Sequence, residues 1–521
     1  MKAFKRKDGN KTLCMAPWTH TYLSPQTERR MCCASTEKAE SFEQYIDTGS
    51  DKKEYNPKTL DEHWNSEHMK SVRRRMMAGE ELPECQVCNN KLLNTDVYRT
   101  YFNSLFGHKE DELWQKTNED GSTEMPVVSF DYRFSNLCNF KCRMCGDMLS
   151  SSWESEQRKN DMWSPWAKPW MADPVRGKIK NFQEDQVEKE FARAVDNHLI
   201  EEIYWVGGEP LMFEQHWKYM KQIVDQGDAD KVYVRYNTNL SRTKYKGIDL
   251  YKDLLVHFKD WQICASLDAT GEIGEWIRDG LNYEQWLQNF RDGLQIKKHD
   301  RQMRLDLTIT TPGLLDLKNM FKLSKQLGVE ILTKVVFTFS PDIVLSPLAL
   351  PRQLLNDIVD ELLEFIEPRA DRKQRSMVDV LKNLKTRPNI QEQWPDTYEH
   401  QLLEGKMYQE NIARIRKDYK KTTLPQILSA DQRLIDWILM NTNKSDQVKG
   451  FYNKHPFPGP YTATSVKEYT GQNRYISFIA ENIKNSFKVL DAGCGTGFIT
   501  NYLAQTYPDK QFVGVDFADS M

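Results

Sequence analysis

Short apolar or alternating runs recur between residues 125 and 345, and segments with helix-like spacing separate them. Six such runs follow one another along the chain: PVVSFDYRF, EEIYWV, KVYVRY, WQICASL, MRLDLTIT and ILTKVVFTF. Strands that alternate with helices predict a parallel sheet, because a parallel pair needs a crossover connection. Right-handed crossovers would curve this α/β sheet into a barrel or partial barrel, whose functional loops lie at the carboxyl ends of the strands.

The segments after these six runs have other patterns. Residues Pro351 to Lys421 are charged and amphipathic, with LLNDIVDELLEFI at helical spacing, and indicate a helical bridging segment. After the proline-rich stretch HPFPGP, a unit of strand, turn and helix begins at Phe487. These changes predict domains over residues 1–124, 125–345, 346–450 and 451–521.

The first crossover, from about Gly146 to His198, is long and contains Trp153, Trp163, Trp166 and Trp170. A lid over a substrate would explain such a segment, but large aromatic side chains serve mainly in burial. We therefore expect an inserted pair of helices that packs through these rings.

Composition excludes several classes of protein. The chain has 521 residues, of which 39% are hydrophobic and 28% charged, which is typical of a folded protein and not of a disordered one. Its 72 basic and 75 acidic residues give a net charge of -3, so no excess of charge indicates a nucleic acid partner. No apolar run follows the basic N-terminus, and a stretch of about 18 apolar residues occurs nowhere. The sequence therefore predicts a cytoplasmic protein without a membrane partner.

Eight of the ten cysteines lie before residue 146, and three of them form one motif. Cys138, Cys142 and Cys145 have the spacing CxxxCxxC in SNLCNFKCRMCGD, directly after the first run. In a reducing compartment such residues indicate metal binding. Three thiolates can hold three irons of a cubane and leave the fourth iron open to another molecule. Structural zinc, the alternative, needs four closed ligands, and no fourth Cys or His lies near this loop in the sequence.

The loop resembles the cluster loop of the radical SAM superfamily, and the resemblance covers roughly residues 125 to 345. It implies a partial (β/α)6 TIM-like barrel in which Cys138, Cys142 and Cys145 hold a 4Fe-4S cluster. In that family the open iron binds S-adenosylmethionine, and one electron cleaves it to a 5'-deoxyadenosyl radical that abstracts hydrogen from a substrate. The resemblance therefore implies an enzyme with a reductant such as a flavodoxin or ferredoxin.

A second motif supports this resemblance: Gly207, Gly208, Glu209 and Pro210 follow the second run, as the GGEP motif follows the second strand in that family. Glycines would let the backbone approach the cosubstrate, and Glu209 would accept hydrogen bonds from its ammonium group. An ordinary Gly-Pro turn is the alternative. Further contacts with S-adenosylmethionine are implied at polar strand ends, by Asn237 with Asn239 and by Ser266 with Asp268.

Two cations within the loop have two interpretations. Lys141 and Arg143 could tune the potential of a cluster by their charge. We expect instead that these side chains are exposed and solvated.

The remaining early cysteines lie in CMAPW, RRMCCAS and LPECQVC. Their order resembles the SPASM or twitch module, although that module usually follows the barrel and has a glycine where this chain has Thr27. The resemblance implies an auxiliary 4Fe-4S cluster on Cys14, Cys32, Cys85 and Cys88, with Cys33 as the alternative to Cys32. Structural zinc is the competing interpretation, because four thiolates also close a tetrahedral site.

The last segment contains DAGCGTG and, further on, a second apolar run that ends in an acid. It resembles the first motif of Rossmann-like class I methyltransferases, which implies a site for S-adenosylmethionine at Asp491, Gly493, Gly495 and Asp516. Two strands cannot bury a sheet, so we expect an incomplete Rossmann-like unit, with Cys494 as a small buried residue and without methyl transfer by this chain alone.

The leading hypothesis is a radical SAM enzyme that abstracts hydrogen from a substrate. One alternative is a methyltransferase for which the barrel is an accessory, and another is a zinc-stabilised interaction module without catalysis. Relatives with SPASM or twitch modules often modify peptides or proteins, so the resemblance implies that class of substrate among others. The sequence itself names neither the substrate nor the residues that act on it.

Overall fold

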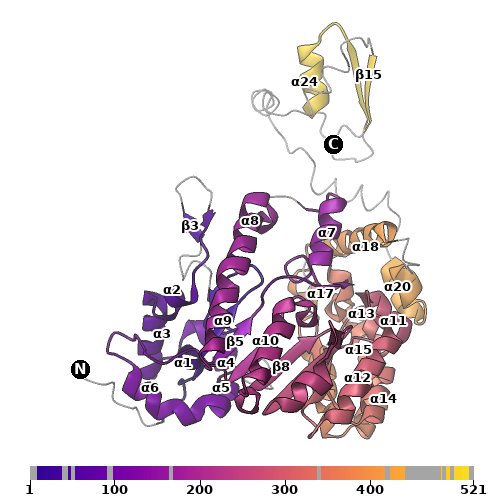
Figure 1. Cartoon of the computed structure of the whole chain (residues 1–521). Coiled ribbons are helices and arrows are strands. Elements are labelled where there is room, and N and C mark those ends of the chain that lie inside the picture. The colour runs from indigo at the N-terminus through magenta and orange to yellow at the C-terminus, as the bar shows by residue number, and fades with distance from the viewer. Residues whose placement is uncertain are drawn as a thin grey trace. The chain divides into compact units, whose positions relative to one another are not determined.

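A computed structural model describes residues 9–37, 45–47, 53–90, 98–163, 168–336, 342–416, 423–439, 483, 488–492 and 498–515 (Figure 1). The chain divides into two compact units. The first comprises Met1–Pro395 with Glu404–Ile427, and the second comprises Asp396–Leu403 with Leu428–Met521. Each unit is described by itself.

The first unit is built around an eight-stranded sheet with the order β14-β13-β11-β8-β7-β5-β1-β2. Six of these strands are the six runs of the sequence, and all neighbours among them are parallel. The predicted α/β class and parallel sheet are therefore confirmed. The six strands are β5 (Ser129–Tyr132), β7 (Glu202–Trp205), β8 (Tyr233–Thr238), β11 (Asp260–Ser266), β13 (Met303–Ile309) and β14 (Glu330–Val335).

Helices fill the crossovers between these strands (Figure 1). The first crossover holds three of them, and Trp153 in the first is buried, as expected, while Trp163 and Trp170 are half-buried against Arg158 and Arg176. Trp166 lies outside the described residues. The crossover helices are α7 (Ser151–Lys159), α8 (Asp173–Phe182), α9 (Glu188–Asp196), α10 (Glu214–Asp225), α11 (Gly271–Ile277), α12 (Tyr283–Ile296), α13 (Thr311–Leu314) and α14 (Leu317–Leu327).

The two faces of the sheet differ in polarity, as the alternation along β8 shows. Val234, Tyr236 and Thr238 are buried, and Tyr236 contacts His216 of α10. Arg235 and Asn237, between them, are half-buried and point to the other face. We call this second face, which also carries Glu202, Tyr204, Cys264 and Asp306, the polar face of the sheet.

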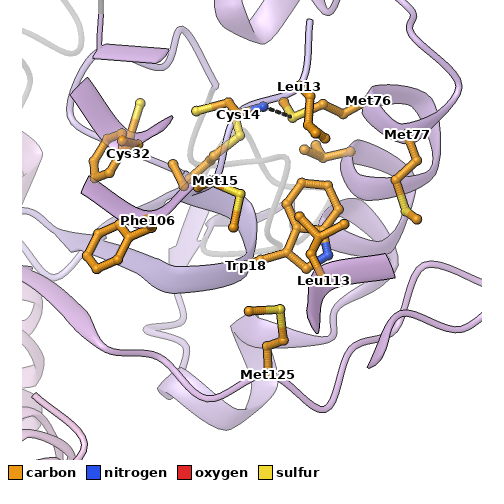
Figure 2. Close-up of a cluster of buried hydrophobic side chains, with 14 of the residues drawn as sticks. Leu13, Cys14, Met15, Trp18, Cys32, Met76, Met77, Phe106, Leu113 and Met125 are labelled. Atoms are coloured by element: carbon orange, nitrogen blue, oxygen red, sulfur yellow. Dashed lines mark hydrogen bonds between the residues drawn. The ribbon is translucent and has the colours of Figure 1, made fainter. Parts of the chain in front are cut away.

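The N-terminal residues contribute two strands to the same sheet. β1 (His20–Leu23) runs parallel to β5, and β2 (Arg29–Arg30) runs antiparallel to β1. A hydrophobic core packs beside them (Figure 2), and it joins Trp18 of α1 (Ala16–Thr19) to Met76 and Met77 of α3 (Glu67–Met77) and to Met125. One continuous sheet therefore crosses residue 124, where the sequence pattern changes.

The other elements of this region are short. β3 (Tyr45–Asp47) and β4 (Lys53–Tyr55) form a small antiparallel ribbon. The helical segments are α2 (Leu60–Trp64), η2 (Pro83–Cys85), α4 (Gln86–Asn89), α5 (Tyr98–Phe106), η3 (Gly107–Lys109) and α6 (Glu110–Lys116).

The segment predicted to be a helical bridge consists mainly of helices among the residues that the structure describes. Its first helix buries the apolar stripe of LLNDIVDELLEFI and packs against α14 and α16, while α16 also packs against β14. The helices are α15 (Arg352–Ile366), α16 (Arg375–Thr386), α17 (Ile390–Gln393), α18 (Tyr398–Ile415) and α19 (Leu424–Leu428).

The second unit contains the predicted order of strand, helix and strand. β15 (Lys488–Ala492) pairs in parallel with β16 (Gln511–Val515), and α24 (Phe498–Thr506) lies between them in the chain. Another helix of this unit is α20 (Gln432–Leu439). Asp491 belongs to β15, whereas Gly493, Cys494, Gly495 and Asp516 lie outside the described residues. Among the described helices, none has the length and apolar character needed to cross a membrane.

Candidate functional site

The cysteine triplet lies in the loop that follows β5, at the carboxyl end of the parallel strands. Within this loop, β6 (Lys141–Cys142) forms an antiparallel ribbon with β12 (Arg278–Asp279), in which Cys142 lies opposite Arg278. The backbone N–H of Arg143 also donates to the carbonyl of Ile277 at 2.8 Å. The loop is therefore held by a segment that follows it in the chain by more than a hundred residues.

The first turn of α7 holds the other side of the loop. The Ser152 hydroxyl donates to the carbonyl of Cys138 at 2.7 Å, and the Ser150 hydroxyl donates to the carbonyl of Phe140 at 2.6 Å. The indole N–H of Trp153 donates to the carbonyl of Cys142 at 2.7 Å. These three bonds hold the loop through its backbone carbonyls and do not use the cysteine sulfurs.

Burial controls the protonation of the triplet. It raises the pKa of the Cys138 thiol to about 12 and also raises the pKa of Cys142 and Cys145. Metal binding requires thiolates, so iron would displace protons from these sulfurs.

The donor set of this loop fits an iron-sulfur cluster better than a single ion. Within the described ranges, no three His, Cys, Asp or Glu side chains are gathered closely enough to hold one metal ion. Tetrahedral zinc, at about 2.3 Å from each sulfur, would keep its sulfurs roughly 4 Å apart. A cubane distributes its ligands over several metal atoms and needs no such convergence.

The GGEP turn packs directly on the cluster loop. Gly207 and Gly208 both have left-handed φ angles, 82° and 55°. A Cβ atom on Gly208 would lie 2.4 Å from the carbonyl oxygen of Leu137, and one on Gly207 would lie 2.5 Å from the Cβ of Arg133. The glycines thus allow close approach to the protein's own loop, whereas the sequence suggested an approach to the cosubstrate.

Glu209 is buried and already has protein partners. Its carboxylate accepts hydrogen bonds from the backbone of Leu211 at 3.0 Å, from the Thr238 hydroxyl at 2.6 Å and from the backbone of Asn239 at 2.6 Å. Burial raises the pKa of Glu209 to about 7. Glu209 therefore joins the loop after β7 to the end of β8, and its contact with a cosubstrate stays a prediction.

The polar strand ends divide into two groups. Asn239 lies at the triplet, with its side-chain nitrogen 4.0 Å from the sulfur of Cys138. Asn237 lies on the polar face, where it donates to Asp306 at 2.9 Å and accepts from Tyr204 at 2.8 Å. Ser266 is half-buried at the end of β11.

Asp268 reaches the triplet through an arginine that sequence reasoning missed. One carboxylate oxygen lies 2.7 Å from Nε of Arg278, and the other accepts from the backbone of Thr308 at 2.9 Å. Nη1 of the same guanidinium lies 3.9 Å from the sulfur of Cys142. Arg278 stands in the turn WIRDG, where nothing in the sequence separates a buried arginine from a solvated one.

The cations inside the loop are not solvated, and the expectation that they are exposed was wrong. Arg143 is only 1% exposed; it stacks 3.9 Å from the Trp276 ring and donates to Gln409 of α18 at 3.0 Å. Lys141 is half-buried and pairs with Glu156 at 2.6 Å. Exposure was expected because isolated charges usually remain in water, but the α18 segment covers this side of the loop.

Arg416, directly after α18, is the centre of this cover and was also missed. It is fully buried, and its guanidinium lies 2.6 Å from Glu156 and 3.3 Å from Asp279. It also donates to the carbonyl of Lys141 at 3.1 Å and lies 4.4 Å from the centre of the Trp153 ring. The helical segment after the barrel therefore closes over the cluster loop.

Four of the five outer cysteines lie together at one pocket. Cys14, Cys32, Cys85 and Cys88 line one pocket, together with Tyr98 and other residues. Burial raises the pKa of Cys14 to about 12 and that of Cys85 to about 11. Glu84 also lines the pocket, and the four sulfurs supply the donor types of an iron-sulfur cluster or of zinc.

Cys33 does not line this pocket and faces elsewhere. Its thiol lies near Tyr98, which also lines the pocket, and near Asp131 of β5 and Arg133 directly after β5. Burial raises the pKa of Cys33 to about 11. The adjacent cysteines 32 and 33 thus point to different surroundings.

Thr27 occupies the position at which the SPASM and twitch modules have a glycine. It has a left-handed φ of 64°, a conformation that favours glycine and is rare for a β-branched residue. Its hydroxyl contacts the Tyr55 hydroxyl and donates to the carbonyl of Gln26 at 2.6 Å. The turn between β1 and β2 therefore has the glycine geometry although the glycine is absent.

Comparisons with known proteins agree with the motifs. Residues 132–293 match the model of the radical SAM superfamily, and residues 483–521 match a methyltransferase domain model. No protein of curated function matches the chain. The predicted radical SAM domain is thus confirmed for residues 132–293.

Two solved structures of SuiB from Streptococcus suis are similar to the chain, one bound to the precursor peptide SuiA and one bound to S-adenosylmethionine. The identities are 11% and 12%, and the TM-score is 0.29 for each. The matches cover 56% of this chain and 65% and 64% of the SuiB chains, less than two thirds of their length. Similarity of this degree carries no argument about a substrate.

Replacing Arg416 by Gln should loosen the cluster loop. The change removes the fully buried cation of Glu156 and Asp279 and leaves them the half-buried Lys141, so the cost should be lower than the roughly 3–5 kcal/mol of a buried charge left unpaired. We expect a lower denaturant midpoint and less iron per chain after anaerobic reconstitution. Arg414→Gln is the matched control, because Arg414 lies two residues earlier, is exposed and, among the described residues, donates locally to Asn411 at 2.7 Å. Equal iron and equal midpoints for both variants would refute this role.

Proposed function

We propose that this radical SAM enzyme cleaves S-adenosylmethionine reductively at a 4Fe-4S cluster held by Cys138, Cys142 and Cys145. The resulting 5'-deoxyadenosyl radical abstracts hydrogen from a substrate that binds at the polar face of the sheet. The observation that carries the proposal is the triplet itself, which lies at the carboxyl end of the first of six parallel strands inside the matched domain.

The cluster, when bound, supplies the electron and one iron open to the cosubstrate. The protein's own groups hold it in place. The hydroxyls of α7 and the ribbon with β12 fix the loop backbone, while Asn239 and Arg278 place N–H donors beside two of the three sulfurs. We propose Gly207, Gly208, Glu209, Asn237, Ser266 and Asp268 as the surroundings of S-adenosylmethionine.

The polar face supports a polar substrate. Glu202 is fully buried and accepts from Arg235 at 3.0 Å, and the Arg235 guanidinium lies 4.1 Å and 4.2 Å from the rings of Tyr101 and Tyr204. Asp131 is buried with one carboxylate oxygen that has no hydrogen-bond partner among the described residues. An unpaired buried acceptor is costly, so a substrate N–H or O–H group is its natural partner. Peptides and proteins carry such donors, and we propose them as the substrate class.

For the outer site, we propose an auxiliary 4Fe-4S cluster on Cys14, Cys32, Cys85 and Cys88. The common pocket of these four sulfurs supports this ligand set, and the separate surroundings of Cys33 argue against the alternative. With every iron ligated by protein, such a cluster would transfer electrons and would not bind substrate directly. A flavodoxin or ferredoxin is the proposed reductant.

The second unit supports a narrower proposal. Its match to a methyltransferase domain and the parallel β15–β16 pair favour a site for S-adenosylmethionine at the carboxyl end of β15, where Asp491 lies. Gly493, Gly495 and Asp516 complete the proposed site from outside the described residues.

Replacing Cys142 by Ala should abolish cosubstrate cleavage. Loss of one of three ligands from an open cluster leaves the metal unanchored, so the yield of 5'-deoxyadenosine with dithionite should fall to background. Cys264→Ala is the matched control for the loss of a buried thiol, since Cys264 is 7% exposed and Cys142 is 8% exposed. Its place on the polar face does not affect the result, because the assay contains no substrate. The proposal fails if the iron-loaded parent forms no 5'-deoxyadenosine, or if the Cys142 variant forms as much as the parent.

Replacing Cys32 and Cys33 separately by Ala should show which of the two is a ligand of the outer site. We expect the Cys32 variant to lose about four irons and their sulfide per chain, the content of one cubane, and the Cys33 variant to retain the parental content. Iron, zinc and acid-labile sulfide analysis of both proteins gives the answer. The reverse pattern would exchange the two roles, and zinc without sulfide loss would replace the auxiliary cluster by a structural zinc site.

A further inference from the structure

We propose that Arg278 sets the reduction potential of the cluster held by the triplet, by placing a cation and an N–H donor beside Cys142. This inference rests on the proposed function. Arg278 is not a ligand of the cluster, and the cysteine motif does not indicate its position.

The backbone pairing of β12 with β6 brings Arg278 next to Cys142. Arg278 and Cys142 are directly opposed in the antiparallel ribbon of β12 and β6. Opposed residues in such a ribbon present their side chains to the same face at short range. Nη1 of Arg278 accordingly lies 3.9 Å from the sulfur of Cys142.

Asp268 holds the guanidinium of Arg278 in its orientation toward Cys142. It binds Nε of Arg278 at 2.7 Å, and its other oxygen is held by the backbone of Thr308 at the end of β13. Asp268 is fully buried and the Arg278 side chain is 11% exposed, so water competes little for either group. Because the guanidinium is planar and rigid, the ion pair at Nε also limits where Nη1 can point.

The order of the charges decides the direction of the effect. The guanidinium stands between the carboxylate and the sulfur, so the charge nearest to Cys142 is positive although the pair is neutral overall. Reduction adds an electron to the cluster, and a neighbouring cation with a donor N–H stabilises the reduced state. Arg278 should therefore make the potential less negative and the cluster easier to reduce.

The contacts of Asp268 also alter the interpretation of that residue. The sequence suggested a contact with S-adenosylmethionine; in the structure one carboxylate oxygen accepts from the backbone of Thr308 and the other forms an ion pair with Arg278. Its contact with the arginine makes Asp268 a positioning residue for Arg278, whatever further contact it makes.

The test is an anaerobic redox titration of the reconstituted full chain, followed by electron paramagnetic resonance. The signal that changes on addition of S-adenosylmethionine identifies the triplet cluster, and the Cys142→Ala chain supplies the spectrum of the outer site for subtraction. The variants are Arg278→Gln, Arg278→Lys and the double change Arg278→Gln with Asp268→Asn. Iron content is measured for each.

Arg304→Gln is the matched control. The Arg304 side chain is also 11% exposed and pairs with a carboxylate, Glu330, with its Nε at 2.8 Å. The structure gives it no contact with a triplet sulfur among its described contacts. Its replacement should leave the potential at the parental value.

For Arg278→Gln we expect about a tenfold lower ratio of reduced to oxidised cluster at a fixed potential, which is about 59 mV for a one-electron couple. The double variant separates the loss of the arginine from the exposure of an unpaired Asp268, and its potential should still be more negative than that of the parent. Arg278→Lys should fall between the parent and Arg278→Gln, because it retains the charge without the rigid fork.

A double variant with parental iron and parental potential overturns the role of Arg278. If neither variant with Gln takes up iron, the Lys variant decides: a more negative potential supports the role and an unchanged one refutes it. A parent chain without any signal that responds to S-adenosylmethionine would instead refute the proposed function. The two failures are therefore distinguishable.

Discussion

The site depends on the short antiparallel ribbon between Lys141–Cys142 and Arg278–Asp279. The loop that carries the three cysteines follows β5 and has little regular structure of its own, so its backbone must be fixed by other segments. The ribbon ties it to the connection after β11, and the serines of α7 tie its other side. Because the carboxyl ends of parallel strands meet at one edge, these distant segments are available at the same place.

Buried charge is the second constraint, and it comes from three parts of the chain. Arg143 belongs to the loop, Arg278 to the crossover after β11 and Arg416 to the helical segment after the barrel. Buried ion pairs are weak sources of stability, but an unpaired member is strongly destabilising. The loop conformation is thereby coupled to the correct docking of the helical segment, since only then does Arg416 join Lys141 in neutralising Glu156.

The sequence patterns predicted the strands and helices that have a locally visible apolar face. They missed the strand and the buried side chains whose partners lie far away in the chain. The six barrel strands are visible because alternation or continuous apolar character marks them locally. β1 is only HTYL, four residues beside a cysteine motif, and its partner β5 lies more than a hundred residues away. Likewise the glycines of GGEP were recognised, but their close neighbour is the Leu137 carbonyl, and Arg278 and Arg416 look like solvated charges until the fold buries them.

The place of β1 also accounts for a cysteine module that precedes the barrel. β1 adds in parallel to β5, the edge strand of the six, so the N-terminal residues extend the sheet on the side where the triplet loop begins. Cys14 lies before the start of β1 and Cys32 follows β2, which places both toward the amino end of the strands. The triplet lies at the carboxyl end. One sheet therefore fixes the separation of the two groups of cysteines in this chain.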